Sequence, residues 1–216
     1  MSERVGAAAS GPERRAGKTS PPGAVRATDS RARSEQKQRM IRGELYRADD
    51  EELSADRLRC RLLLEQFNAT SAAEPALRHK LLHDLLGHLG RDAVLMPRLE
   101  CDYGYQIWIG DRTFINYGAV ILDCAAVTIG GDVQIGPSVQ LLTATHPLEA
   151  SARRTGYESA APITIGFGAW LGGGVIVCPG VTVGDETVVG AGTVVTADLP
   201  PRVLAYGNPA RIIRDL

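Results

Sequence analysis

The stretch ITIGFGAWLGGGVIVCPGVTVGDETVVGAGTVVT, residues 163–196, places an aliphatic residue at every sixth position. These positions are Ile165, Leu171, Val177, Val183, Val189 and Val195. A fixed short period is typical of a solenoid. Six residues fit one short strand and one corner, with the aliphatic side chain pointing into a narrow prism. Glycine often follows the aliphatic residue, because a crowded turn favours the residue without a side chain.

The same period continues towards the N-terminus. One series comprises Ile109, Ile115 and Ile121, and another comprises Ile129, Ile135 and Leu141. The step from 121 to 129 indicates a two-residue insertion, whereas the 24 residues from 141 to 165 equal four whole periods. We therefore predict an all-β fold, a parallel β-helix of hexapeptide repeats with about 18 residues in each three-sided coil.

The residues before the hexads have a helical pattern. We predict one helix over about 36–47, and a second that begins at the N-cap Ser54 and stops near Asn68. A third follows Ser71-Ala-Ala-Glu74, which has the spacing of a capping box, and ends at Gly87 or Gly90. The sequence thus predicts a helical cap segment before the β-helix.

Three regions follow from these patterns. Residues 1–36 are rich in Ala, Gly, Ser, Arg and Pro and are predicted to be disordered, because they have too little apolar surface to offset chain entropy. An organelle transit peptide is the alternative, which four acidic residues in this segment disfavour. Residues 37–92 form the cap and 93–216 the β-helix, with a protruding loop at 146–162 where the hexads are interrupted.

Composition excludes several classes of function. The formal net charge is −1, so no field of one sign favours binding to nucleic acid or to a membrane surface. No apolar run approaches the roughly 20 residues of a membrane span, and the N-terminus lacks a secretory core. We expect a cytoplasmic protein. The four cysteines, Cys60, Cys101, Cys124 and Cys178, fit neither a zinc pattern nor a disulfide framework.

Five motifs together resemble one family. They are Met40-Ile-Arg-Gly-Glu-Leu-Tyr46, Cys101-Asp-Tyr-Gly-Tyr105, Thr143-Ala-Thr-His-Pro147, Trp170-Leu-Gly-Gly173 and Gly207-Asn-Pro-Ala-Arg211. Over residues 37–216 the chain resembles the hexapeptide-repeat acyltransferases, and among them the maltose and galactoside O-acetyltransferases and the nodulation acetyltransferases. The resemblance implies a left-handed β-helix and a homotrimer with active sites between neighbouring helices. It also implies transfer of an acetyl group from acetyl-CoA to a sugar hydroxyl.

His146 is the one histidine of the repeat region and lies where the hexads stop. A sugar hydroxyl is a poor nucleophile and must lose its proton as it attacks a thioester. Imidazole titrates near pH 6.5 and can accept that proton, typically contributing about 10²- to 10⁴-fold in rate. By resemblance, His146 is this general base. The alternative is a histidine that only hydrogen-bonds within its loop.

Asn116 stands where a hexad usually carries a small residue. It matches the asparagine that the galactoside enzymes place beside the catalytic histidine. A side-chain amide can steady the charge of a tetrahedral intermediate. The alternative is a turn asparagine that tolerates an unusual backbone angle.

The resemblance also implies residues for both substrates. Acceptor-binding candidates are Asp102, Asp123, Arg57 and Tyr103. Cofactor-binding candidates are Trp170, Gly172, Ala191 and Thr196, with Arg211 and Arg214 for the phosphates of acetyl-CoA. The chain departs from the family at Ala48, where galactoside enzymes carry an aspartate, which favours a maltose- or glucose-like acceptor. It departs again at Ala197, where lysine is frequent.

Three alternatives remain open at this point. The first is an enzyme of the same fold with another acceptor, such as a galactoside, an amino acid, a nucleotide sugar or a xenobiotic. A metal-dependent carbonic anhydrase needs three histidine ligands, and the repeat region has one, so no metal is expected; His79 and His83 lack a third ligand. A non-catalytic scaffold is the last alternative, which His146 and Asn116 disfavour.

Overall fold

The computed structural model describes residues 34–216. The first helix, α1 (Glu35–Ile41), begins inside the segment predicted to be disordered. The rest of that prediction, residues 1–33, lies outside the described residues. The helix is also shorter than the expected 36–47, because the chain turns at Gly43 and Tyr46–Arg47 form strand β1.

Two further helices complete the cap segment, and a short helix lies in the loop after residue 146. These are α2 (Glu51–Asn68), α3 (Pro75–Leu85) and α4 (Ala150–Arg153). The predicted N-cap Ser54 is wrong: Asp50 caps α2 and accepts a hydrogen bond from the Leu53 N–H at 3.1 Å. Helix α2 does stop at Asn68. The Ser71–Glu74 contact forms ahead of α3, which ends at Leu85 because Leu86 is already extended.

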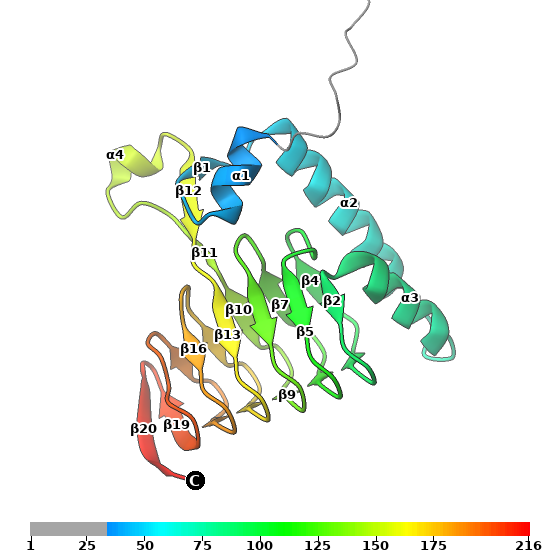
Figure 1. The fold of residues 1–216 in the computed structure, drawn as a ribbon, viewed down its shortest axis with the longest axis vertical. Coiled ribbons are helices and arrows are strands. Elements are labelled where there is room, and N and C mark those ends of the chain that lie inside the picture. The colour runs from blue at the N-terminus through cyan, green and yellow to red at the C-terminus, as the bar shows by residue number, and fades with distance from the viewer. Residues whose placement is uncertain (1–33) are drawn as a thin grey trace, which may run out of the picture. The chain divides into compact units, whose positions relative to one another are not determined.

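The remaining chain coils through three parallel sheets (Figure 1). The first sheet contains β2 (His88–Leu89), β5 (Ile107–Ile109), β8 (Val127–Ile129), β13 (Ile163–Ile165) and β16 (Thr182–Val183). The second contains β3 (Val94–Leu95), β6 (Phe114–Ile115), β9 (Gln134–Ile135), β14 (Trp170–Leu171), β17 (Val188–Val189), β19 (Val203–Gly207) and the antiparallel β20 (Ala210–Asp215). The third contains β4 (Leu99–Cys101), β7 (Ala119–Leu122), β10 (Gln140–Leu142), β15 (Ile176–Val177) and β18 (Val194–Val195). The predicted β-helix of hexapeptide repeats is confirmed.

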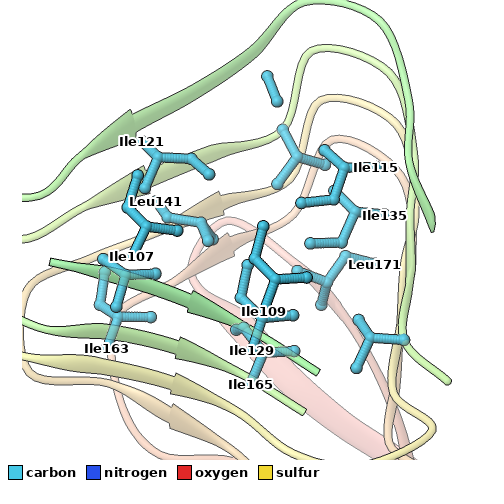
Figure 2. Close-up of a cluster of buried hydrophobic side chains, with 14 of the residues drawn as sticks. Ile107, Ile109, Ile115, Ile121, Ile129, Ile135, Leu141, Ile163, Ile165 and Leu171 are labelled. Atoms are coloured by element: carbon cyan, nitrogen blue, oxygen red, sulfur yellow. The ribbon is translucent and has the colours of Figure 1, made fainter. Parts of the chain in front are cut away.

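The core of the β-helix is made of stacked aliphatic side chains. Ile109 pairs in register with Ile129, Ile129 with Ile165, and Ile165 with Val183, and all four are buried. Figure 2 shows that such columns from the three sheets converge on the axis of the prism. Burying each of these side chains contributes about 1.5 to 3 kcal/mol. The hexad positions read from the sequence are therefore the positions that hold successive coils together.

A small antiparallel sheet joins the cap to the protruding loop. The chain leaves the coil through β11 (Ala144–Thr145) and returns through β12 (Tyr157–Ala160). Strand β12 lies between β11 and β1, which comes from the cap (Figure 1). Helices α2 and α3 pack against the first coil with Leu64, Phe67 and Leu85, which share a core with Leu99 and Ile107.

The close stacking of coils explains the glycine at Gly110. A Cβ added there would lie 2.4 Å from the backbone nitrogen of Gly131 in the next coil. At Gly174, by contrast, no atom lies within 4 Å, but φ is +69°. The two glycines are therefore required for different reasons, one for space and the other for backbone angle.

We expect Gly110→Ala to destabilise the protein by about 3 kcal/mol or more, because the backbones of two coils must separate. Gly174→Ala should cost only the left-handed backbone angle, about 1 kcal/mol. Thermal unfolding followed by circular dichroism compares the two variants. Equal losses in the midpoint would show that the contact between coils at Gly110 is not limiting.

Candidate active site

The turn that carries Asp102 is held by a buried carboxylate. Asp123 is 0% exposed and accepts hydrogen bonds from the N–H groups of Asp102 at 3.0 Å, Tyr103 at 2.9 Å and Gln106 at 3.3 Å. Its oxygens face the backbone and not the solvent. The prediction that Asp123 binds the acceptor directly is therefore wrong, and this residue instead fixes the turn that presents Asp102.

Asp102 itself is partly exposed and lies in a polar cluster. Its Oδ2 accepts a hydrogen bond from the Cys124 thiol at 3.3 Å. Burial raises the pKa of Asp102, while the Cys124 hydrogen bond and the charge of Arg57 partly oppose the rise. A carboxylate with this access and few donors of its own is suited to accept a hydrogen bond from a hydroxyl.

Arg57 reaches this cluster from helix α2. It donates to the Tyr103 hydroxyl at 2.9 Å and to the backbone carbonyl of Ala48 at 2.6 Å. Burial lowers the pKa of Arg57, but Tyr103, Asp102 and Glu158 raise it above its usual value. Tyr103 is almost fully buried, so the prediction that it contacts the acceptor is not supported by its position. Its role in this structure is to position Arg57.

His146 lies beside this cluster, directly after strand β11. Its side chain is 59% exposed, and its Nε2 lies 3.8 Å from Oε2 of Glu158 in strand β12. Sequence reasoning missed Glu158, because it lies in the non-repetitive loop and no motif marks it. Only the antiparallel pairing of β11 with β12 brings the two residues together.

Asn116 and Trp170 meet elsewhere on the molecule. They line a small cavity of about 140 Å³ on the second sheet, together with Phe114, Gln134 and Gly136. Asn116 Oδ1 accepts a hydrogen bond from the Tyr117 N–H at 2.8 Å, which is the turn role considered above. Its amide nitrogen makes no hydrogen bond to residues 34–216, and the partly exposed side chain lines the cavity, so the amide can donate to a ligand.

The expected cofactor residues lie mainly along this corner of the coils. Gly172 follows β14, and a Cβ on it would lie 2.6 Å from the backbone nitrogen of Ala191 in the next coil. Thr196 follows β18 and is exposed at the far end of the third sheet. Arg211 and Arg214 are exposed on β20. Among the described residues they donate only to the nearby carbonyls of Ala210 and Asp215, so both guanidinium groups can bind anions.

Comparison with known proteins is consistent with this arrangement. The maltose acetyltransferase hexapeptide capping motif matches residues 39–90, and the bacterial transferase hexapeptide (six repeats) matches residues 162–197. Nodulation protein L of Rhizobium meliloti is 45% identical over 177 residues, covering 82% of this chain and 97% of the relative. Galactoside O-acetyltransferase of Escherichia coli is 38% identical over 179 residues, covering 83% and 88%. The chain belongs to the hexapeptide-repeat acetyltransferase family.

Solved structures of this family share the fold. A maltose O-acetyltransferase from Clostridium difficile has a TM-score of 0.83 and 42% identity, covering 84% of this chain and 97% of the other. A galactoside acetyltransferase in complex with coenzyme A has a TM-score of 0.81 and 37% identity, covering 85% and 92%. Both the cap and the β-helix of this acetyltransferase thus have counterparts of known structure.

A single copy of this acetyltransferase does not bring all the expected residues together. Asn116 precedes strand β7, and Asp123 follows it. Strand β7 covers Ala119–Leu122, which span about 13 Å, and the turn at Tyr117–Gly118 lies before it, so the two residues lie at opposite corners of the third sheet. His146 leaves the coil on the Asp123 side, where Ala125 N–H donates to Thr143 Oγ1 at 3.0 Å. His146 and Asn116 therefore belong to two separate half-sites.

Two further findings concern metals and membranes. Across residues 34–216, no group of three His, Cys, Asp or Glu side chains is placed to hold a metal ion. In the same part of the chain, the helices are too short or too polar to span a bilayer. All four cysteines are free.

The burial of Asp123 predicts a pH dependence of stability. Burial raises the pKa of Asp123 to about 6, and the charge of Asp102 adds to the rise, although the N–H groups of Tyr103 and Gln106 oppose it. Between about pH 4 and pH 6 the folded protein therefore keeps a proton that the unfolded chain has released, and this group lowers the unfolding free energy as pH rises, by about 2 to 3 kcal/mol. Asp123→Asn should lack that decrease.

Denaturant unfolding between pH 4 and pH 7 measures the effect in the wild type and in Asp123→Asn. Asp132→Asn serves as the control, because Asp132 is paired with Arg112 at the surface and its pKa is lowered. Parallel curves for the wild type and Asp123→Asn would show that the buried carboxyl is ionised throughout this range.

Proposed function

We propose that the protein transfers the acetyl group of acetyl-CoA to a hydroxyl of a maltose- or glucose-like sugar. The observation that carries the proposal is the accessible imidazole of His146 next to Glu158, whose charge, like that of Asp102, acts on Arg57. The family supports the reaction class, and a solved relative is named a maltose O-acetyltransferase. Galactoside enzymes carry an aspartate at the position of Ala48, which has no acidic side chain, and its backbone carbonyl accepts a hydrogen bond from Arg57.

The chemistry needs one base and one stabilised oxyanion. His146 takes the proton of the acceptor hydroxyl while its oxygen attacks the thioester carbonyl, and a tetrahedral intermediate forms. The C–S bond then breaks, and the CoA thiolate receives the proton from the imidazolium. The amide N–H of Asn116 from a neighbouring copy would donate to the developing oxyanion, an interaction that strengthens in the transition state.

Acetyl-CoA would lie along the coils. Trp170 offers an exposed ring, Gly172 packs closely against Ala191 at the same corner, and Thr196 lies at the far end of the third sheet. Arg211 and Arg214 supply charge for the phosphates, which matters because Ala197 provides none. A structure of a related galactoside acetyltransferase holds coenzyme A.

We further infer a homotrimer. The two half-sites, one with His146 and the other with Asn116, lie at opposite corners of one chain, so a complete site requires a neighbouring copy. A closed ring of three chains would give three equivalent sites. Residues 37–92 would act as the cap and 93–216 as the catalytic β-helix, with loop 146–162 reaching across. Because the donor is an intracellular metabolite, we place the enzyme in the cytoplasm.

The first prediction concerns the base. His146→Ala should lower kcat by at least about 10²-fold without loss of fold, because proton removal then falls to water. Release of CoA thiol with maltose as acceptor measures turnover, and circular dichroism checks the fold. His83→Ala is the matched control, since His83 is exposed on helix α3. Near-normal turnover of His146→Ala would show that His146 is not the base.

The second prediction concerns the shared site. Asn116→Ala and His146→Ala should each be inactive alone, whereas a mixed assembly contains sites with one intact residue from each chain. In every mixed trimer, one of the three sites has both residues intact, so trimers that carry both tags should recover about one third of the wild-type activity. Co-expression of two differently tagged variants, purified over both tags, measures this recovery. No recovery, or an active monomer by light scattering, would contradict a site shared between copies.

A further inference from the structure

Glu158 is a partly buried carboxylate beside the proposed base. Its side chain is 16% exposed, against 59% for His146, and Oε2 lies 3.8 Å from Nε2 of the imidazole. Within residues 34–216, His146 is its one ion-pair partner. This separation exceeds that of an N–H···O hydrogen bond, so the imidazole does not satisfy the carboxylate.

The backbone holds Glu158 in place from both sides. Glu158 pairs directly with Tyr46 of β1, and the next residue, Ser159, pairs with Thr145 of β11. Directly opposed residues of antiparallel strands project to the same face of the sheet. Because Tyr46 is fully buried, the Glu158 side chain also points to the inner face, towards the acceptor cluster.

The surroundings of Glu158 leave it short of donors. The buried Tyr46 hydroxyl lies by the Cys124 thiol, and the Arg57 guanidinium is already bound to Tyr103 and Ala48. A largely buried carboxylate without donors is unfavourable, and a hydroxyl that arrives with a ligand would relieve it. The carboxylate therefore faces the space where the acceptor must lie if His146 is to reach its hydroxyl.

We propose that Glu158 determines acceptor specificity by accepting a hydrogen bond from a second hydroxyl of the acceptor. One hydroxyl gives its proton to His146, and a neighbouring hydroxyl of the same molecule donates to Glu158. The 3.8 Å between the two side-chain atoms suits hydroxyl groups on nearby carbons. The acceptor class is thus a sugar or polyol with neighbouring hydroxyls, and alcohols with a single hydroxyl are poor acceptors. This inference rests on the proposed acetyl transfer.

The contact between Glu158 and the second hydroxyl is tested with methyl α-glucoside and its 2-, 3-, 4- and 6-deoxy analogues. Each sugar is assayed with the wild type, with Glu158→Leu and with the control Ser159→Ala. Loss of the reacting hydroxyl abolishes acetylation in all three proteins. Loss of the hydroxyl bound by Glu158 should lower kcat/KM by about 10- to 100-fold in the wild type and in Ser159→Ala. In Glu158→Leu, the analogue that lacks the hydroxyl bound by Glu158 should react at the same rate as the parent glucoside, because the contact is already absent.

Two results would overturn the proposal. If Glu158→Leu lowers kcat/KM by the same factor for the parent and for every analogue, the carboxylate only positions His146. If the variant keeps both the kcat/KM and the discrimination of the wild type, another group binds the second hydroxyl.

A failure of the transferase proposal is recognised separately, as the absence of thiol release by the wild type with any sugar. Ligand-observed NMR titration of the CoA-loaded proteins then gives the answer without turnover. The same pattern is expected in Kd: one analogue binds more weakly than the parent to the wild type and equally to Glu158→Leu. Equal Kd values for all five sugars in the wild type would overturn the assignment.

Discussion

The in-register stacking of coils is the constraint on which the whole structure depends. Each inward side chain must lie directly over its counterpart, as Cys101, Ile121, Leu141 and Val177 do in the third sheet. Extra residues can therefore enter only at corners, where they leave the columns undisturbed. From the third sheet to the first, Cys101 to Ile109 and Ile121 to Ile129 are steps of eight residues, Leu141 to Ile165 is a step of 24, and Val177 to Val183 is a step of six. All of the excess chain in these coils is thus at one corner, and it forms the acceptor half-site.

The cap completes that corner through charge and aromatic contacts. Tyr103 and Tyr105 belong to the turn that Asp123 holds, and their ring centroids lie 5.5 Å apart. Arg57 from α2 lies over the first ring at 5.9 Å, and Lys37 from α1 lies over the second at 5.2 Å. Cations over aromatic faces are attracted by the ring quadrupole, more strongly where water is excluded. The cap therefore covers the open end of the prism and also orients the guanidinium that faces the acceptor.

The sequence predicted the regular parts of the molecule well and the irregular parts poorly. Periodic aliphatic residues report directly on burial, so the columns from Ile109 to Val195 followed from spacing alone. Ser54 and Asp50 are both good N-caps, and only the packed position of α2 decides between them. The sequence around Asp123 is the same whether its oxygens face solvent or backbone N–H groups, so it could not show that this carboxylate is structural. Glu158 gave no signal, because its importance arises from the pairing of β12 with its neighbour β11 and with β1, which lies about 110 residues earlier in the sequence.

The two half-sites differ in how freely they can change. The donor side lies on regular hexads, where Gly172 is packed against the next coil and an added Cβ would meet backbone atoms. A substitution there disturbs the stack that holds the protein together, so recognition of the donor is tied to the fold. The acceptor side is assembled from a corner insertion, a loop and the cap, whose side chains can be exchanged without altering any inward column. One architecture can therefore keep acetyl-CoA as donor while residues such as Arg57, Asp102 and Glu158 adapt the other half-site to a particular acceptor.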